Sequence, residues 1–382
     1  MGAKTPAAAA AGRESLAPPD CLPAFIEIRR FVRLSYRRAN ILLMRPALKP
    51  GLLTVWRNRD TVQFGIDPRR AVALTGMRGT GDLLRLLDGS RDRRQVLAAA
   101  GDLGMDAAAA DRVLALLAAA GALDDHPDGR GALPAGARAR LAPELATASL
   151  AHRDADGGAR TLARRQAARV RVHGASRAGL SIAGMLAAAG VGLVLSTGPA
   201  LPGPPERGPG PAGSGGTGAA AAPPPGRAAT ARAPESRPRR RPDLVILADT
   251  HRRELPAALV RHRVPHLAAA ASEAIGVVGP LVLPGRSACL RCLDLTRAER
   301  DPAWPLILAQ LAGQPGADPP ACDTVLASMV AAQATAQALA FVDQGGEAAA
   351  VTDGTLELVL PGWQWRRRSW QPHPRCGCRH QG

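Results

Sequence analysis

Apolar and polar residues begin to alternate after residue 44, and the pattern predicts a compact N-terminal module over residues 45–125. The alternating apolar positions are Leu53, Val55, Val62, Phe64 and Ile66. The polar run at 57–60 separates the first two positions from the last three, so the segment is predicted to form a β-hairpin. Residues 1–44 show no sustained period, and we expect a disordered tail. Met44 is a second candidate for the translation start beside Met1.

Three apolar clusters at helical spacing follow the hairpin. The leucine-rich segment 83–87 ends at Gly89, and Ser90 can cap the next helix. A third helix is predicted to start at Asp106 and to stop at Gly121. A hairpin with three short helices is the composition of a small α+β winged-helix domain. Such domains bind DNA with the third helix, or bind a peptide by adding a strand to the small sheet.

The peptide mode is favoured because the predicted third helix is poor in side chains that read bases. It begins with four alanines at 107–110, followed by Asp111 and Arg112. Strand addition would take place along the hairpin, where we expect a peptide to contact Val55, Val62 and Phe64. Nucleic acid is therefore not the expected partner, and a winged-helix DNA-binding regulator is kept as a third hypothesis.

The second half of the chain, residues 169–382, alternates strand-like and helix-like segments and is predicted to form a Rossmann-like α/β domain. Residues 126–168 are polar and rich in Gly, Ala and Arg, and we expect a linker with some helix. The Pro/Gly/Ala/Arg run at 199–241 cannot bury enough apolar surface and is expected to be a disordered insert. The expected elements are strands at 170–172, 191–195, 243–249 and 275–283, helices at 180–189, 255–261 and 324–342, and a closing β-segment at 356–365.

The apolar run from Ala178 to Leu195 is long enough to suggest a membrane span. It contains four glycines and follows a predicted strand and turn, so we interpret it as part of the α/β fold. Residues 1–43 show no charged start followed by an apolar core and a cleavage site, so no secretory signal is predicted. We expect a soluble, cytoplasmic protein with no membrane partner.

Composition adds a strong positive charge. The 382 residues include 49 Lys and Arg against 32 Asp and Glu, a net charge of +17, and the lysines are Lys4 and Lys49 alone. This surplus suits a polyanion or an acidic peptide. A coding bias toward Ala, Arg, Gly and Pro explains it equally well, so the net charge by itself selects no partner.

Four of the six cysteines form two close pairs, Cys289-x-x-Cys292 and Cys376-x-Cys378. Two thiolates at the first spacing form half of a tetrahedral zinc site, and a distant pair can complete it. Because four thiolates leave no open coordination position, we expect the zinc to be structural. It would join the C-terminal tail to the loop after the 275–283 strand. A redox dithiol and a chance cluster are the alternatives.

The turn Gly174-Ala-Ser-Arg-Ala-Gly179 lies between a predicted strand and helix, where nucleotide-binding turns occur. The usual fingerprint has glycine at the position of Ser176, and an acidic residue where this chain has 196–198. We therefore expect Gly174, Ser176 and Gly179 to keep the packing role of such a turn and little of its ligand binding. ATP and Mg²⁺ are not expected cofactors.

Two further residues are candidates for catalysis. Asp249 follows a buried-looking strand at the edge where α/β sites form, and it can bind Mg²⁺ or cap the next helix. Cys322 precedes a long Ala-rich helix, where it is either an activated thiol or an inert buried cysteine.

Together these features resemble the ThiF family, the bacterial relatives of ubiquitin-activating enzymes. The similar segments are the glycine turn, Pro242–Asp249, Gly279–Gly285 with the first cysteine pair, the helix with Gln337-Ala338, and Pro372–Cys378. Residues 289–305 and the 45–125 module resemble the ocin-ThiF-like branch, which carries an N-terminal winged-helix peptide-recognition element. That branch binds the leader of a ribosomal precursor peptide and presents it to a YcaO-type cyclodehydratase.

Active relatives hold ATP with acidic residues, an Arg-Gln pair and a lysine. Here the insert takes that place and no lysine follows Lys49, although Asp249 and Cys322 align with the family's Mg²⁺-binding aspartate and sulfur-carrying cysteine. We therefore expect a non-adenylating scaffold for a leader peptide. The alternative is an active adenylyltransferase that activates the C-terminus of a carrier protein. Relatives of this family commonly form homodimers.

Overall fold

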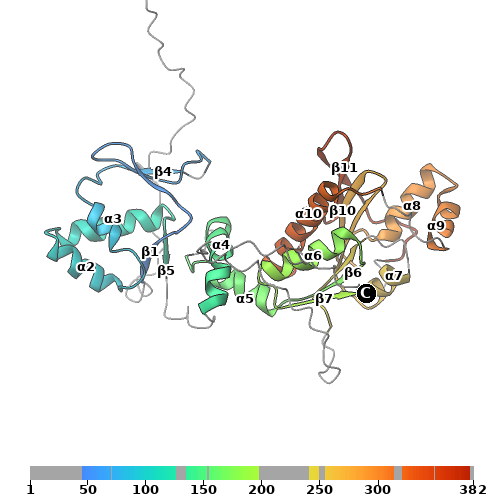
Figure 1. The fold of residues 1–382 in the computed structure, drawn as a ribbon, viewed down its shortest axis with the longest axis horizontal. Helices are drawn as coiled ribbons and strands as arrows, with labels where there is room; N and C mark the ends of the chain where they lie inside the picture. The colour runs from blue at the N-terminus through green and yellow to red at the C-terminus, as the bar shows by residue number, and fades with distance from the viewer. Residues whose placement is uncertain are drawn as a thin grey trace, which may run out of the picture. The chain divides into compact units, whose positions relative to one another are not determined.

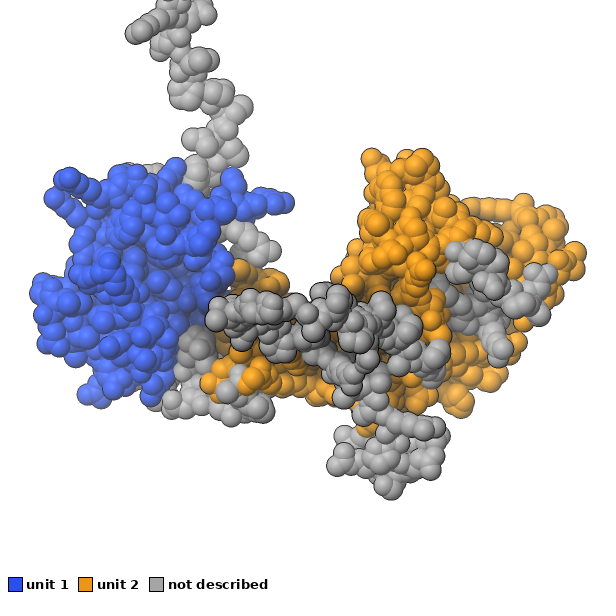
Figure 2. Space-filling model, in the orientation of Figure 1, with its two compact units in different colours: residues 1–127 blue, residues 128–382 orange. Residues whose placement is uncertain are grey.

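The computed structural model describes residues 45–69, 71–125, 135–152, 155–197, 241–248, 254–313, 321–347 and 349–378. The chain divides into two compact units, residues 1–127 and 128–382 (Figure 2). The predicted tail at 1–44 and residues 199–240 of the predicted insert lie outside the described residues.

The described part of unit 1 contains two small antiparallel sheets and three helices (Figure 1). The strands are β1 (Pro46–Leu48) paired with β5 (Leu123–Asp125), and the sheet formed in order by β2 (Thr54–Trp56), β3 (Val62–Phe64) and β4 (Val72–Leu74). The helices are α1 (Gly81–Arg85), α2 (Arg93–Asp102) and α3 (Ala107–Ala119). The predicted hairpin is β2–β3, and the three predicted helices are present. Because β3 is central, β2 and β4 each have an edge without a strand partner among the described residues.

Side-chain caps set two helix starts in unit 1. Asp106 caps α3 as predicted, since its carboxylate accepts a hydrogen bond from the Ala109 N–H at 3.0 Å. The cap of α2 is Asp92 and not the predicted Ser90. The Asp92 carboxylate accepts from the Gln95 N–H at 2.8 Å, and the Gln95 side chain accepts from the Asp92 N–H at 2.9 Å, which completes a capping box.

Residues 135–167, predicted to be part of a linker, form two helices of unit 2. These are α4 (Ala135–His152) and α5 (Ala159–Ala167). Leu141 and Leu162 are buried, and Gly190 lies against both side chains. Each helix buries few apolar residues, and α5 contacts helix α10 (Thr324–Asp343) through the charged pair Arg165–Asp343. Their amino-acid composition therefore resembles that of a linker.

Unit 2 is built on a mixed seven-stranded sheet in the order β12-β11-β10-β9-β8-β6-β7 (Figure 1). Strands β6 to β9 are parallel, and β10 to β12 extend the sheet in antiparallel fashion. Their bounds are β6 Arg169–His173, β7 Leu193–Thr197, β8 Leu244–Ala248, β9 His266–Ser272, β10 Ile275–Val282, β11 Gly354–Val359 and β12 Trp365–Ser369. β6 is the first strand of this sheet along the chain. The next strand, β7, lies on one side of β6, and the following strand, β8, lies on the other side, so the strand order reverses at β6. Ligands of α/β sheets bind at such a point.

Helices cover both faces of this sheet. Leu244 and Ile246 of β8 pack in one core with α6 (Arg177–Ala188) and α10 (Thr324–Asp343). Val245 and Leu247 point to the opposite face and pack with α7 (Glu254–Arg261). Two more helices, α8 (Leu290–Arg300) and α9 (Trp304–Gly313), follow β10.

The apolar run from Ala178 to Leu195 divides between α6 and β7, in agreement with its interpretation as part of the α/β fold. Among the described helices, α10 is long and apolar enough to cross a membrane. However, 56% of its most apolar window is buried inside unit 2, where it packs against α6 and the sheet. We therefore interpret α10 as the central core helix.

His266, the first residue of β9, is a buried imidazole with 0% exposure. Its Nδ1 lies 2.9 Å from the Val264 carbonyl oxygen, so Nδ1 carries the proton and donates it. Its Nε2 has no hydrogen-bond partner among the described residues. Burial lowers the pKa of His266 to about 4, because the imidazolium would lose its hydration.

The low pKa of His266 is expected to reduce the free energy of unfolding of unit 2 as the pH falls from 6.5 toward 4. In this range the unfolded chain binds a proton at His266 that the folded chain excludes, so protons favour unfolding. Urea unfolding at pH 7 and pH 4.5, followed by tryptophan fluorescence, measures the effect. The His266→Gln variant should lose about 2 kcal/mol less stability than the natural chain over this interval. An equal loss in both proteins would contradict this role of His266.

Candidate metal centre and strand-end turn

The structure brings the four predicted metal ligands together. Cys289 and Cys292 lie at the start of α8, and Cys376 and Cys378 lie in the tail after β12. All four residues are buried, and their Sγ atoms lie within 4.8 Å of one another. This set could hold a metal such as zinc, with four thiolates and no open coordination position.

The distances between the sulfur atoms fit this chemistry. Cys289 Sγ lies 3.7 Å from that of Cys292 and 3.4 Å from that of Cys376, and Cys292 Sγ lies 3.5 Å from that of Cys378. Tetrahedral zinc with bonds of about 2.3 Å separates its sulfur ligands by about 3.8 Å. The separations are too long for disulfides, whose S–S bond is about 2.05 Å. Gly377, with φ of +70°, forms the turn that points both tail cysteines to one place.

The protonation of the thiols follows from their packing. The pKa of Cys292 is lowered to about 4, chiefly because the Cys289 thiol donates a hydrogen bond to it. The hydrogen bond with Cys292 and burial raise the pKa of Cys289. Burial raises the pKa of Cys378 to about 12. A four-thiolate site therefore has to release protons from its remaining thiols as the metal binds.

Side chains around the cysteines hold the tail against β11 and α8. Trp370 is buried and donates its Nε1–H to the Thr355 hydroxyl at 2.9 Å. The His373 ring lies 2.9 Å from the Glu299 carboxylate, and Arg375 donates to the same carboxylate at 2.9 Å. These contacts fix the approach of Cys376 and Cys378, as outer-shell partners of metal ligands do.

The glycine turn at 174–179 packs closely on the end of β8. Gly174 has φ of +118°, and a Cβ there would lie 1.9 Å from the Ala248 carbonyl oxygen. A Cβ on Gly179 would lie 2.7 Å from the Gly174 carbonyl oxygen. Ser176 caps α6, since its hydroxyl accepts from the Gly179 N–H at 3.1 Å. Both glycines are thus required by packing, and the Ser176 hydroxyl uses a helix N–H that could otherwise bind a phosphate.

Of the two catalytic candidates, Cys322 is among the described residues and Asp249 is not. Asp249 follows β8 but lies outside the described residues. Cys322 is half-buried directly before α10, with its Sγ 3.7 Å from the Asp323 carbonyl oxygen. Arg177, at the start of α6, donates to the Thr324 hydroxyl at 3.4 Å. The start of α10, and Cys322 with it, is therefore a neighbour of the glycine turn.

The three residues expected to contact a peptide have different surroundings. Val55, on the edge strand β2, is 45% exposed. Val62 and Phe64, on the central strand β3, are 0% and 1% exposed, so their side chains belong to the core and offer no surface to a peptide. Leu53 and Trp56 flank Val55 and are also exposed. Trp56 is not among the three expected contact residues, although its position as an aromatic residue beside Val55 in a short strand indicated it.

No protein-family model and no curated protein matches the chain. Solved structures match its fold. The heterocyclase TruD has a TM-score of 0.57 and 15% identity, over 87% of this chain and 42% of TruD. A heterocyclase in complex with substrate and cofactor has a TM-score of 0.58 and 13% identity, over 87% of this chain and 39% of that one. E. coli MccB with AMPCPP and MccA has a TM-score of 0.52 and 11% identity, over 87% of this chain and 99% of MccB.

At these identities the likeness establishes the fold alone. This chain spans about two-fifths of the length of the two heterocyclases, which it covers to 42% and 39%.

Proposed function

We propose that this chain is a non-adenylating, ThiF-like scaffold that binds the leader of a ribosomal precursor peptide and presents it to a YcaO-type cyclodehydratase. Unit 1 is the winged-helix peptide binder, and unit 2 is a Rossmann-like platform held together by one zinc ion. The likeness to TruD, and to MccB, which one structure describes as a Microcin C7 biosynthetic enzyme, supports a role in peptide maturation. In this proposal ring formation belongs to the partner enzyme.

The exposed edge of β2 is the observation on which the peptide-binding role depends. Leu53, Val55 and Trp56 are 62%, 45% and 41% exposed on or beside this three-residue strand. An extended peptide can hydrogen-bond to the edge of β2 that has no strand partner in the described part of the chain, and cover these apolar side chains. A peptide bound there would become a fourth strand of the small sheet.

The charges beside this edge favour an acidic leader. An open hollow of about 610 Å³ adjoins Trp56 and is lined by Asn58, Arg59, Arg78 and two glycines. Both arginines are exposed. A positive rim next to an apolar edge would attract an acidic peptide and set its register.

The proposal assigns zinc to the four cysteines and no nucleotide to the glycine turn. The sequence supports the second assignment, because no lysine follows Lys49 to neutralise a triphosphate. The absence of a nucleotide is also supported by Ser176, because its hydroxyl accepts a hydrogen bond from the Gly179 N–H at the start of α6 that could otherwise bind a phosphate. The metal would hold the tail to α8 and would take no part in chemistry.

Leader binding is expected to weaken at least about tenfold in the double variant Leu53→Glu, Val55→Glu, because both changes place like charge against an acidic leader. Fluorescence polarisation with synthetic leaders, taken from precursor genes adjacent to the gene for this chain, measures the affinity. Leu103→Glu alters an exposed leucine of unit 1 away from β2 and serves as the control. If Ala73→Pro in β4 abolishes binding and the β2 variant does not, the β2 assignment is wrong.

An active adenylyltransferase is the second candidate, and the match to MccB with AMPCPP over 99% of that chain favours it. ATP–pyrophosphate exchange in the presence of candidate carrier proteins and precursor peptides separates the two functions. We expect no exchange above background. Exchange that Cys322→Ser or Asp249→Asn removes would establish the enzyme and overturn the scaffold.

A further inference from the structure

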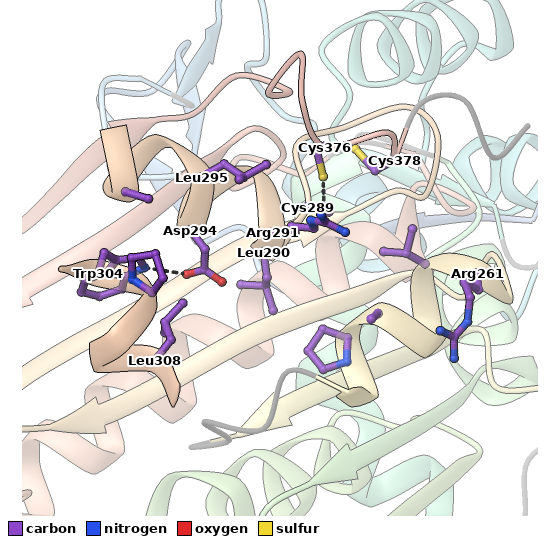
Figure 3. Close-up of a pocket in the computed structure, with 15 residues that line it drawn as sticks. Arg261, Cys289, Leu290, Arg291, Asp294, Leu295, Trp304, Leu308, Cys376 and Cys378 are labelled. Atoms are coloured by element: carbon purple, nitrogen blue, oxygen red, sulfur yellow. Dashed lines mark hydrogen bonds between the residues drawn. The ribbon is translucent and has the colours of Figure 1, made fainter. Parts of the chain in front are cut away.

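Unit 2 contains a cavity that the proposed function does not use. It has a volume of about 430 Å³ and lies between α7, α8 and α9, next to the cysteine cluster (Figure 3). Its apolar wall includes Pro256, Val260, Leu290, Leu295, Trp304 and Leu308. The volume falls within the range of about 300–1,000 Å³ that is typical of ligand pockets.

The lining of the cavity has two basic residues and one acidic residue. Arg261 and Arg291 line the cavity and are exposed, and neither pairs with a carboxylate among the described residues. Asp294 is the acidic residue of the lining, and its carboxylate accepts from Trp304 Nε1 at 3.3 Å. Figure 3 shows Arg261 at one end of the cavity and the Trp304–Asp294 pair at the other. Two guanidinium groups thus stand beside apolar surface.

The helix that forms one wall also carries apolar surface outside the cavity. On α9, Leu306 is 63% exposed, and Ile307 and Leu311 are each 38% exposed. Exposed apolar side chains that adjoin a pocket are typical of a docking site for another polypeptide. A small ligand would fill the cavity and leave this face of α9 uncovered.

We propose that this cavity is the anchor point for a polypeptide segment in which a large apolar side chain lies next to a carboxylate. The apolar side chain would pack between Leu290 and Leu308, and the carboxylate would pair with Arg261 or Arg291. The two arginines favour an acidic segment because of charge complementarity. The exposed apolar face of α9 favours a polypeptide over a small ligand, because a polypeptide can cover that face as well as fill the cavity. This site is separate from the β2 edge, so it can be present or absent whatever unit 1 binds.

A phage-displayed library of random dodecapeptides, selected on the full chain, tests the proposal. Enriched peptides are synthesised and measured by fluorescence polarisation against three variants. Arg261→Glu with Arg291→Glu reverses the charge of the lining, and Ala257→Trp fills the cavity from α7. Arg300→Glu, an exposed arginine of the same helix as Arg291 and outside the lining, is the matched control. Metal content and far-UV circular dichroism must match those of the natural chain, so that lost binding is not lost folding.

We expect enriched peptides with a large apolar residue beside Asp, Glu or a free C-terminus. Their affinity should fall about tenfold or more in the charge-reversal and cavity-filling variants and stay unchanged in Arg300→Glu. Peptides without a carboxylate, or peptides that bind all variants equally, would overturn the proposal. So would concentration-dependent dimerisation that Ala257→Trp abolishes, because a second copy of the chain would then occupy the cavity. A loss of binding in the β2 double variant Leu53→Glu, Val55→Glu would assign the selected peptides to unit 1 and also overturn it.

Discussion

Replacement of Cys292 by serine is expected to abolish metal binding at the four-cysteine cluster and to unfold much of unit 2. The Cys292 sulfur lies 3.7 Å from that of Cys289 and 3.5 Å from that of Cys378. Its loss leaves the site with three of its four thiolate ligands. A structural zinc contributes on the order of 10 kcal/mol to folding. Because a domain is stable by only about 5–15 kcal/mol, this loss is comparable to the whole stability of the unit.

Metal analysis by plasma mass spectrometry and thermal unfolding measure the two effects. The natural chain should contain about one zinc per molecule, and Cys292→Ser about none. Cys322→Ser is the matched control, since this half-buried cysteine lies outside the cluster and should leave the metal in place. Equal zinc content and equal unfolding temperatures in Cys292→Ser and the natural chain would show that the cluster holds no structural metal.

Replacement of Asp343 by alanine is expected to destabilise unit 2 by about 3–5 kcal/mol. Asp343 ends α10 and accepts two hydrogen bonds of 2.8 Å from Arg165 of α5. Arg165 donates a third to Glu144 of α4 at 2.8 Å. The hydrogen bonds with Asp343 raise the pKa of Arg165, and both partners are buried. Removing the carboxylate would leave a buried guanidinium with only one carboxylate partner.

The double variant Arg165→Met, Asp343→Leu separates the cost of an uncompensated charge from the value of the pair. It should be considerably more stable than Asp343→Ala, because no buried charge is left without its partner. Chemical unfolding monitored by circular dichroism compares the three proteins. Arg160→Met, at an exposed position of the same helix α5, is the control and should change stability by less than about 0.5 kcal/mol. If Asp343→Ala behaves like this control, the pair does not stabilise the contact between α5 and α10.

The predicted elements that proved present are those with strong local patterns. The hairpin around the polar run at 57–60, the cap at Asp106 and the βαβ unit from residue 169 depend on neighbours in sequence, and short-range periodicity indicates them. Residues 126–168 are expected to be a linker with some helix, and the structure has helices α4 and α5 there, of which α5 contacts α10 through Arg165. Its partner Asp343 is 178 residues away, and no local pattern contains it.

The candidate metal ligands can be identified from the sequence alone, because a four-thiolate site requires four sulfur donors and the two close cysteine pairs supply them. The sequence also determined that no lysine is available for a triphosphate beyond position 49. Which apolar residues of the hairpin are exposed depends on the register between its strands. Val55 and Val62 follow the same alternation, but the register pairs Val55 with Gln63 and Trp56 with Val62, so Val55 lies on the face opposite to that of the buried Val62 and Phe64. The cavity beside α9 likewise arises from helices packed together in space, and periodicity along one segment carries no information about the distance between segments.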